Sequence, residues 1–214
     1  MSDSVSNDAY ECTVTVDCAV FGFQDDILKL LVIKRSMEPF KNKWLLPGGV
    51  VQADQSLEQA VDHVLFNLTG IDNIHHEQVK SYSTVDRHPV KRVITTCFYA
   101  LVKPENHPVI AKKYVSDVEW VPIDNLPLLA IDHHQLALDA HEKLRSNLEN
   151  RLLFKELLPE KFTLKEVQDL YESVLNQKLD RRNFRKRILQ IEALENTGEI
   201  KKGHKGGPQL YKLN

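Results

Sequence analysis

The sequence predicts an α+β protein in two parts: a mixed β-sheet with helices packed on it, then a smaller domain of two helices and a β-hairpin. Three observations lead to this prediction. Short β-branched, apolar runs alternate with amphipathic helical stretches up to about residue 150. Two closely spaced helical patterns and a glycine-rich hairpin then follow. The balance of charge also changes at this point.

Charge divides the chain. Residues 151–214 carry 14 Lys and Arg against 9 Asp and Glu, whereas the preceding 150 residues carry 14 against 21. A basic end on an acidic body indicates two domains, one of which faces a polyanion. We therefore expect a disordered tail over residues 1–9, one domain over 10–150 and a second over 151–214.

The composition is that of a soluble globular protein, with 42% hydrophobic and 27% charged residues among 214. No apolar run approaches the roughly 18 residues that a membrane span needs. The polar start MSDSVSNDAY does not resemble a signal peptide. The cysteines Cys12, Cys18 and Cys97 lie in apolar runs without zinc spacing. We expect reduced thiols, a cytoplasmic location and no membrane contact.

In the first domain, strands are expected at residues 13–23 and 28–34, around 79–85, and at 93–102 and 118–121. A helix is expected over 57–68, because Ser56 and Gln59 suit a capping box and Gly70 is a stop signal. Its apolar face comprises Ala60, Val61, Val64, Leu65 and Leu68. A long helix follows at about 134–148.

In the second domain, Thr163 and Glu166 form a capping box for one helix, and Asp180 caps the next. The buried stripe of the second helix is Phe184, Ile188 and Ile191. Residues 200–213 read as a hairpin with a glycine-rich tip. Two helices joined by a short turn and followed by a hairpin resemble a winged helix-turn-helix.

The second helix presents a basic outer face. Arg182 and Lys186 point about 160° to 200° away from Phe184, so they suit the major groove of DNA. Arg187 lies nearer the core edge. The expected DNA-binding residues are Arg181, Arg182, Asn183, Arg185 and Lys186 on the helix and Lys201, Lys202, His204 and Lys205 on the wing. The alternative is a basic surface helix in a small dimerisation domain.

The stretch LLPGGVVQADQSLEQAVDHVLFNLTGI resembles the Nudix box, G-x5-E-x7-R-E-U-x-E-E-x-G-U, where U is aliphatic. With Gly49 as the first glycine, Gly70 and Ile71 fall on the closing pair. The chemical positions differ. Gln55 replaces the first glutamate, His63 and Val64 replace the arginine and its neighbouring glutamate, and Asn67 and Leu68 replace the paired glutamates.

In working members of that family the glutamates bind a divalent metal, which polarises a diphosphate and activates water. Every box carboxylate is absent here, so we expect no metal, no cofactor and no Nudix-type hydrolysis. The alternative is a Nudix hydrolase of nucleoside-diphosphate-linked compounds with displaced metal ligands.

The combination resembles the Nudix-related transcriptional regulators, and KRSMEPFKNKWLLPGG, AIDHHQLALDA and RRNFRKRI match as well. The family includes regulators of NAD biosynthesis that sense ADP-ribose and regulators of sugar catabolism that sense arabinose. The resemblance implies a Nudix-like mixed-sheet α/β/α sandwich followed by a winged helix-turn-helix domain. It also implies a homodimer that binds operator DNA and a small effector. The loss of the box glutamates and the stretch VDRHPVKRV favour the sugar-sensing branch, and so L-arabinose or a related pentose over ADP-ribose.

The resemblance to these regulators implies that the cleft that binds substrate in Nudix hydrolases serves here to bind an effector. Polar residues within or beside strand ends tend to face clefts, so the candidates for effector binding are Asp17, Arg35, Asp86, Arg87, Arg92 and His133. Asp132 is expected to cap the following helix rather than bind metal. A third possibility is a pseudoenzyme scaffold whose basic helix binds an acidic protein.

Overall fold

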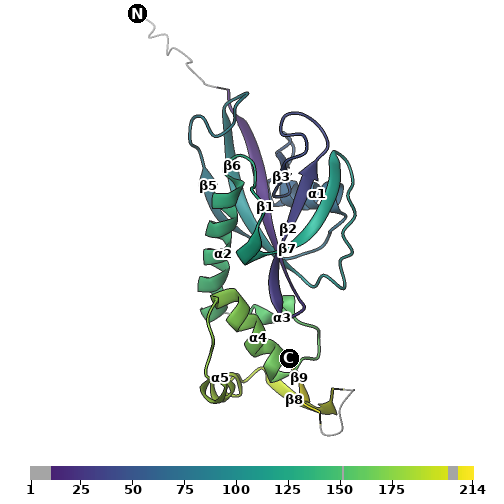
Figure 1. Cartoon of the computed structure of the whole chain (residues 1–214), viewed down its shortest axis with the longest axis vertical. Coiled ribbons are helices and arrows are strands. Elements are labelled where there is room, and N and C mark those ends of the chain that lie inside the picture. Colours follow the sequence, from purple (N-terminus) through teal and green to yellow (C-terminus); the bar gives the residue numbers. More distant parts are fainter. Residues whose placement is uncertain (1–10, 151, 202–206) are drawn as a thin grey trace, which may run out of the picture.

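The computed structural model describes residues 11–150, 152–201 and 207–214 (Figure 1). The tail expected over 1–9 and the wing residues Lys202, His204 and Lys205 lie outside this range. In the described part, a seven-stranded sheet is followed by a small helical domain with a two-stranded hairpin.

The large sheet is mixed. Its strands are β1 (Thr13–Gln24), β2 (Ile27–Arg35), β3 (Trp44–Leu45), β4 (Gly48–Val50), β5 (His76–Tyr82), β6 (Val93–Val102) and β7 (Val115–Pro122). The main order is β3-β2-β1-β6-β5, with β4 paired to β1 and β7 paired to β2. β1 and β6 run parallel, whereas the other pairs are antiparallel.

Helices cover both faces of this sheet. α1 (Leu57–Thr69) packs with Val16, Cys18 and Val20 of β1. α2 (His133–Asn150) packs with Ala19 and Phe21 on the opposite face. Alternate residues of one strand thus enter two separate apolar clusters. The expected α/β/α sandwich is confirmed.

The capping chemistry sets the limits of α1. Ser56 Oγ accepts from the Gln59 backbone N–H at 3.2 Å, and Gln59 Oε1 accepts from the Ser56 N–H at 2.9 Å. Gly70 ends the helix with φ 84°, a left-handed conformation that favours glycine. A 3-10 turn, η1 (Ile123–Asn125), lies between β7 and α2.

The second domain contains α3 (Phe154–Leu157), α4 (Leu164–Leu175), α5 (Arg181–Ile188), β8 (Leu194–Ile200) and β9 (Gln209–Leu213). This is a winged helix, as the sequence predicted. The first hairpin strand begins at Leu194, not at residue 200, because Leu194 packs against the apolar cluster of the domain. Tyr211 of β9 also pairs with Phe162 by two backbone hydrogen bonds.

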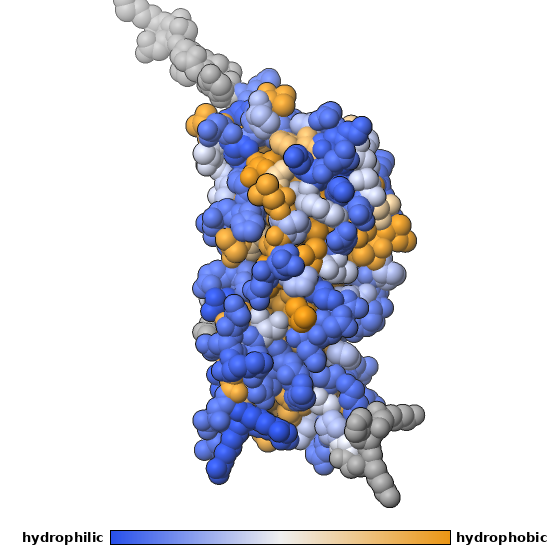
Figure 2. Space-filling model, viewed as in Figure 1, coloured by the Kyte–Doolittle hydropathy of each residue, from blue (hydrophilic) through white to orange (hydrophobic). Residues whose placement is uncertain are grey.

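Among the helices that the structure describes, none combines the length and the apolar composition that a membrane crossing requires. The visible surface is largely hydrophilic, and blue atoms dominate the end that carries α5 (Figure 2).

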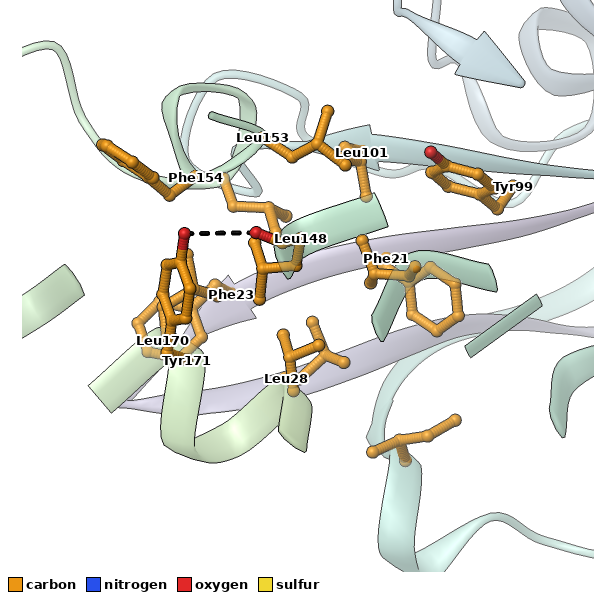
Figure 3. Close-up of a cluster of buried hydrophobic side chains, with 14 of the residues drawn as sticks. Phe21, Phe23, Leu28, Tyr99, Leu101, Leu148, Leu153, Phe154, Leu170 and Tyr171 are labelled. Atoms are coloured by element: carbon orange, nitrogen blue, oxygen red, sulfur yellow. Dashed lines mark hydrogen bonds between the residues drawn. The ribbon is translucent and has the colours of Figure 1, made fainter. Parts of the chain in front are cut away.

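The two domains share one buried cluster (Figure 3). Phe21, Phe23 and Leu28 from the sheet lie with Phe154 and Leu170 from the winged helix. Two polar contacts reinforce it: Tyr171 Oη donates to the Leu148 carbonyl at 3.3 Å, and the Leu28 N–H donates to Ser173 Oγ at 2.8 Å. Helix α4 of the winged domain is therefore packed directly on the β1–β2 hairpin.

Candidate effector cavity and DNA-binding surface

A cavity of about 530 Å³ opens where β1, β2, β4 and α1 meet the loops at residues 83–92 and 111–114. This volume suits a metabolite. Asp17, Arg35, Arg87 and His133, four of the six residues predicted to bind an effector, line it.

Asp17 forms the buried polar floor. Asp17 is 6% exposed, and its Oδ2 accepts a hydrogen bond from Thr95 Oγ1 at 2.7 Å. A Cβ at Gly48 would lie 1.9 Å from Asp17 Oδ1. Glycine is therefore required at position 48 because the side chain of Asp17 occupies the space that a Cβ would fill.

Arg87 is buried beside Asp17, with its side chain 3% exposed. Its Nε and Nη2 donate to the two carboxylate oxygens of Asp132 at 2.9 and 2.7 Å, and Nη2 lies 3.8 Å from Asp17 Oδ2. The carboxylate of Asp132 thus binds Arg87, while its carbonyl accepts the first helical bond of α2, from Leu136. Asp132 precedes α2 as expected, but its side chain is engaged by Arg87.

His133 completes this network. The Leu46 N–H donates to His133 Nδ1 at 3.0 Å, so Nδ1 carries no proton and the ring is neutral with its proton on Nε2. Nε2 lies 3.7 Å from Asp17 Oδ1. His133 is thereby held in one tautomer against the cavity floor.

The rim of the cavity is cationic. Arg35, Lys91 and Lys113 line it and form no ion pair within the described ranges, and Asp17 is the one acidic residue of the lining there. Burial lowers the pKa of His88 below its ordinary value, and the positive charges of Lys91, Arg87 and Arg35 lower it further. The cavity therefore has a positive potential that favours an anion.

An apolar wall faces these charges. It comprises Ile33, Phe40, Leu45, Leu68, Val115 and Ile131. Phe40, Tyr114 and Ile131 all line the cavity with positive φ values of 72°, 63° and 59°. Such values are uncommon outside glycine and are strained at a β-branched residue such as Ile131.

Besides Gly49, four residues at the positions of the box's arginine and glutamates also line the cavity: His63, Val64, Asn67 and Leu68. Gln55 Nε2 lies 3.0 Å from His63 Nδ1. One amide oxygen, one imidazole and two aliphatic side chains do not fit a hard divalent cation, which needs several oxygen ligands. Over the described residues, no three His, Cys, Asp or Glu side chains are grouped to hold a metal.

Two predicted cavity residues lie elsewhere. Asp86 is exposed in the loop before β6, outside the lining. Arg92 Nη1 donates to the Thr84 carbonyl at 2.9 Å and so closes the base of that loop. The sequence reasoning missed Lys91, although it lies in the noted stretch VDRHPVKRV. It also missed Lys113, which no local pattern marks.

The basic helix α5 is arranged as predicted. Phe184 and Ile188 are buried, and Asp180 Oδ1 accepts from the Asn183 N–H at 2.8 Å. The polar residues are exposed: Arg181, Arg182, Asn183, Arg185 and Lys186. None of the four cations among them forms an ion pair within residues 11–150, 152–201 and 207–214. Arg187 instead lies 5.9 and 5.8 Å from the ring centres of Tyr171 and Phe184, a structural position.

Lys201, a predicted DNA-binding residue of the wing, forms an ion pair within the domain. Its Nζ lies 2.7 Å from Glu166 Oε1, so the ammonium group ties β8 to the start of α4 rather than standing free. A second pair, Lys161 Nζ with Glu199 Oε1 at 2.6 Å, holds the same strand.

Comparisons with known proteins identify a family for each of the two domains. Residues 13–141 match the NUDIX domain, and residues 154–213 match the NrtR DNA-binding winged helix domain. The chain is 34% identical to the ADPR responsive transcriptional repressor NtrR of Acinetobacter baylyi over 210 residues, which is 94% of this chain and 81% of that protein.

Solved structures are similar as well. Shewanella oneidensis NrtR complexed with a 27mer DNA superposes with a TM-score of 0.79 at 33% identity, covering 94% of this chain and 93% of that one. The NUDIX domain of the same Shewanella protein complexed with ADP ribose superposes with a TM-score of 0.59 at 32% identity. This match covers 66% of the present chain and 94% of that domain. The chain belongs to the family of Nudix-related transcriptional regulators, in which a NUDIX domain precedes an NrtR-type winged helix.

Proposed function

We propose that this protein is a transcriptional repressor whose affinity for operator DNA changes when ADP-ribose occupies the cavity. The observation that carries the proposal is the cationic rim of Arg35, Lys91 and Lys113, which forms no ion pair among the described residues and faces an apolar wall. A diphosphate supplies the negative charge that the rim lacks, and the wall offers contact for a nucleobase. The ADP-ribose complex of the Shewanella domain supports this choice.

L-Arabinose, which the sequence favoured, remains a prediction with less support. A pentose is uncharged, so it leaves the three rim cations without a counter-charge. Calorimetric titration with each compound separates the two effectors. Binding of L-arabinose without binding of ADP-ribose would overturn the proposed effector.

We infer that the cavity senses its ligand and does not hydrolyse it. His63, Val64, Asn67 and Leu68 provide none of the carboxylates that hold magnesium in a Nudix hydrolase. The test is release of AMP or phosphate from ADP-ribose, NADH and nucleoside triphosphates with magnesium or manganese. Turnover in the enzymatic range of about 1–10³ s⁻¹ would support the hydrolase instead.

The regulator is proposed to act in the cytoplasm as a homodimer, with two copies of α5 reading two half-sites about 34–36 Å, or a multiple of that distance, apart. The solved DNA complex of the Shewanella relative supports operator binding. Light scattering should give twice the 24.6 kDa mass of one chain. A monomeric mass both alone and on DNA would overturn the dimer.

One experiment tests sensing and DNA binding together. ADP-ribose is titrated into the protein by calorimetry, alone and with a duplex from the gene's own upstream region. A coupling of about 1–3 kcal/mol would change the affinity roughly 5- to 150-fold, and the duplex must change ADP-ribose affinity by the same factor. Equal affinities with and without DNA would overturn the proposed regulation.

A further inference from the structure

A second, smaller pocket of about 160 Å³ lies in the winged helix where α4, α5 and β9 meet. Its polar lining is cationic or neutral throughout: Lys165 and Gln168 from α4, Arg181 and Arg185 from α5, and Gln209 from β9. Leu164, Pro208 and Tyr211 form the remaining wall. The pocket has about a third of the volume of the effector cavity, which suits a small anionic group.

Arg181 and Arg185 occupy a different face of α5 from the outermost residues. At 3.6 residues per turn they lie about 60° and 100° from Phe184, whereas Arg182 and Lys186 lie about 160° and 200° from it. The two arginines are four residues apart, so they lie on the same face of α5, toward β9. Both are exposed and have no ion-pair partner in the described part of the chain.

Lys165 is different, because it pairs with Asp169 one turn along α4. This contact fixes the lysine at the pocket edge and partly offsets its charge. The two guanidinium groups therefore provide the charge that remains to be neutralised. Guanidinium groups bind phosphate through two parallel hydrogen bonds, and the amide nitrogen of Gln209 supplies a further donor. The amide of Gln168 already donates to Glu172 and to the Leu179 carbonyl, so it shapes the wall of the pocket.

We propose that this pocket binds one phosphate of the DNA backbone and thereby sets the register in which Arg182 and Lys186 meet the bases. The inference rests on the proposed function, because it takes the winged helix as the DNA-binding domain. Contacts to phosphate position a protein on the duplex, whereas contacts to base edges specify sequence. Four cations of α5 are thus divided by face between the two tasks, Arg181 and Arg185 for the phosphate and Arg182 and Lys186 for the bases.

The test compares two matched double variants of exposed residues, R181Q/R185Q and R182Q/K186Q. Fluorescence anisotropy measures binding to the upstream duplex and to a scrambled duplex over a range of salt concentrations. R181Q/R185Q should weaken binding to both duplexes by the same factor and reduce the salt slope by about one, the value for one lost phosphate. R182Q/K186Q should reduce the preference for the upstream duplex. Thermal unfolding verifies that both variants are folded.

Duplexes with single methylphosphonate linkages identify the phosphate. One neutral linkage in each half-site should weaken the wild-type protein and have no further effect on R181Q/R185Q. If every linkage weakens both proteins equally, the pocket does not bind the backbone. A wild-type protein that binds inorganic phosphate there, seen by NMR shifts of α5, and shows no methylphosphonate effect would also overturn the assignment.

The outcomes separate the two proposals. A wild-type chain that binds neither duplex overturns the regulator and the phosphate-binding pocket together. A wild-type chain that prefers the upstream duplex, with R181Q/R185Q unchanged in affinity and salt slope, overturns the pocket alone.

Discussion

The guanidinium group of Arg87 binds both carboxylate oxygens of Asp132, at 2.9 and 2.7 Å. Arg87 lines the effector cavity, and Asp132 lies directly before α2. Further along this helix, His141 Nε2 donates to the carbonyl of Val174 in α4 at 2.9 Å. A continuous series of contacts therefore joins the cavity to helix α4 of the winged domain.

We expect Asp132→Asn to destabilise the protein and weaken coupling. The substitution leaves the buried guanidinium group with Asp17 at 3.8 Å as its nearest counter-charge. The cost should be about 2–3 kcal/mol, below the roughly 3–5 kcal/mol of a fully buried pair, because the Asp132 side chain is 27% exposed. Urea unfolding measures this loss of stability. In the Asp132→Asn variant, ADP-ribose should change the affinity for operator DNA less than it does in the wild-type protein. The exposed Asp54→Asn is the control; equal effects of the two would contradict the role of this pair.

Lys113→Gln should weaken ADP-ribose binding about tenfold, which corresponds to about 1.4 kcal/mol. Lys113 lies at the cavity rim without an ion pair in the described chain, so its loss removes attraction for the diphosphate and little stability. Calorimetry gives the affinity. Lys143→Gln on the exposed side of α2 removes the same charge away from the cavity and should leave binding unchanged. A similar loss for both variants would indicate only a general electrostatic effect.

Glu166→Gln should make the stability of the winged helix less dependent on pH. Burial raises the pKa of Glu166, but hydrogen bonds from Lys201 and Thr163 outweigh this and leave it below its ordinary value. Because the pKa of Glu166 is lower in the folded than in the unfolded protein, its ionised form stabilises the fold at pH values above the unfolded pKa near 4.5. This stabilisation is lost as the pH falls through the pKa of the folded protein. Glutamine retains the capping box, so only the charge is tested.

At pH 7 the difference should be about 0.5–1 kcal/mol, because the Lys201 side chain is 53% exposed. Thermal unfolding at pH 7 and at about pH 3 measures it. If the wild-type protein remains more stable than Glu166→Gln by the same amount at the lower pH, the charge-based explanation is contradicted.

Phe154→Ala should destabilise both domains by about 3–5 kcal/mol. Phe154 is fully buried in the cluster that joins them, and its ring lies 5.5 Å from that of Phe162. Both tryptophans, Trp44 and Trp120, lie in the large sheet, so their fluorescence reports on the other domain. Leu189→Ala, at an exposed position of the winged helix, is the control. A fluorescence transition that stays in place would show that the domains unfold independently.

Periodic patterns and capping residues predicted the long strands and the helices closely, because these depend on local sequence. β5 lies three residues earlier than expected, at His76–Tyr82, and its pairing with β6 contains a bulge between Gln78 and Lys80 that interrupts the alternating pattern. β3 and β4 have two and three residues, too few for an alternating pattern.

The cavity was predictable only in part. Asp17 and Arg35 lie on long strands, and the alternating pattern of the sequence shows which way their side chains point. Lys113 and Tyr114 reach the cavity from a loop that is placed by long-range contacts. On α5, helical geometry gave the outward direction of Arg182 and Lys186. It did not reveal that Arg181 and Arg185 meet a pocket, because β9 and α4 form the other walls.

The cluster that unites β1, β2, α3 and α4 limits how such regulators can be rebuilt from parts. A winged helix moved onto a different Nudix-type sheet would need an apolar hairpin end equivalent to Phe23 and Leu28, and a partner for Ser173. Grafting at a linker alone would expose Phe154 and Leu170 to water. New sensor and operator combinations in this architecture therefore require the hairpin and the helix that covers it to be exchanged as one unit.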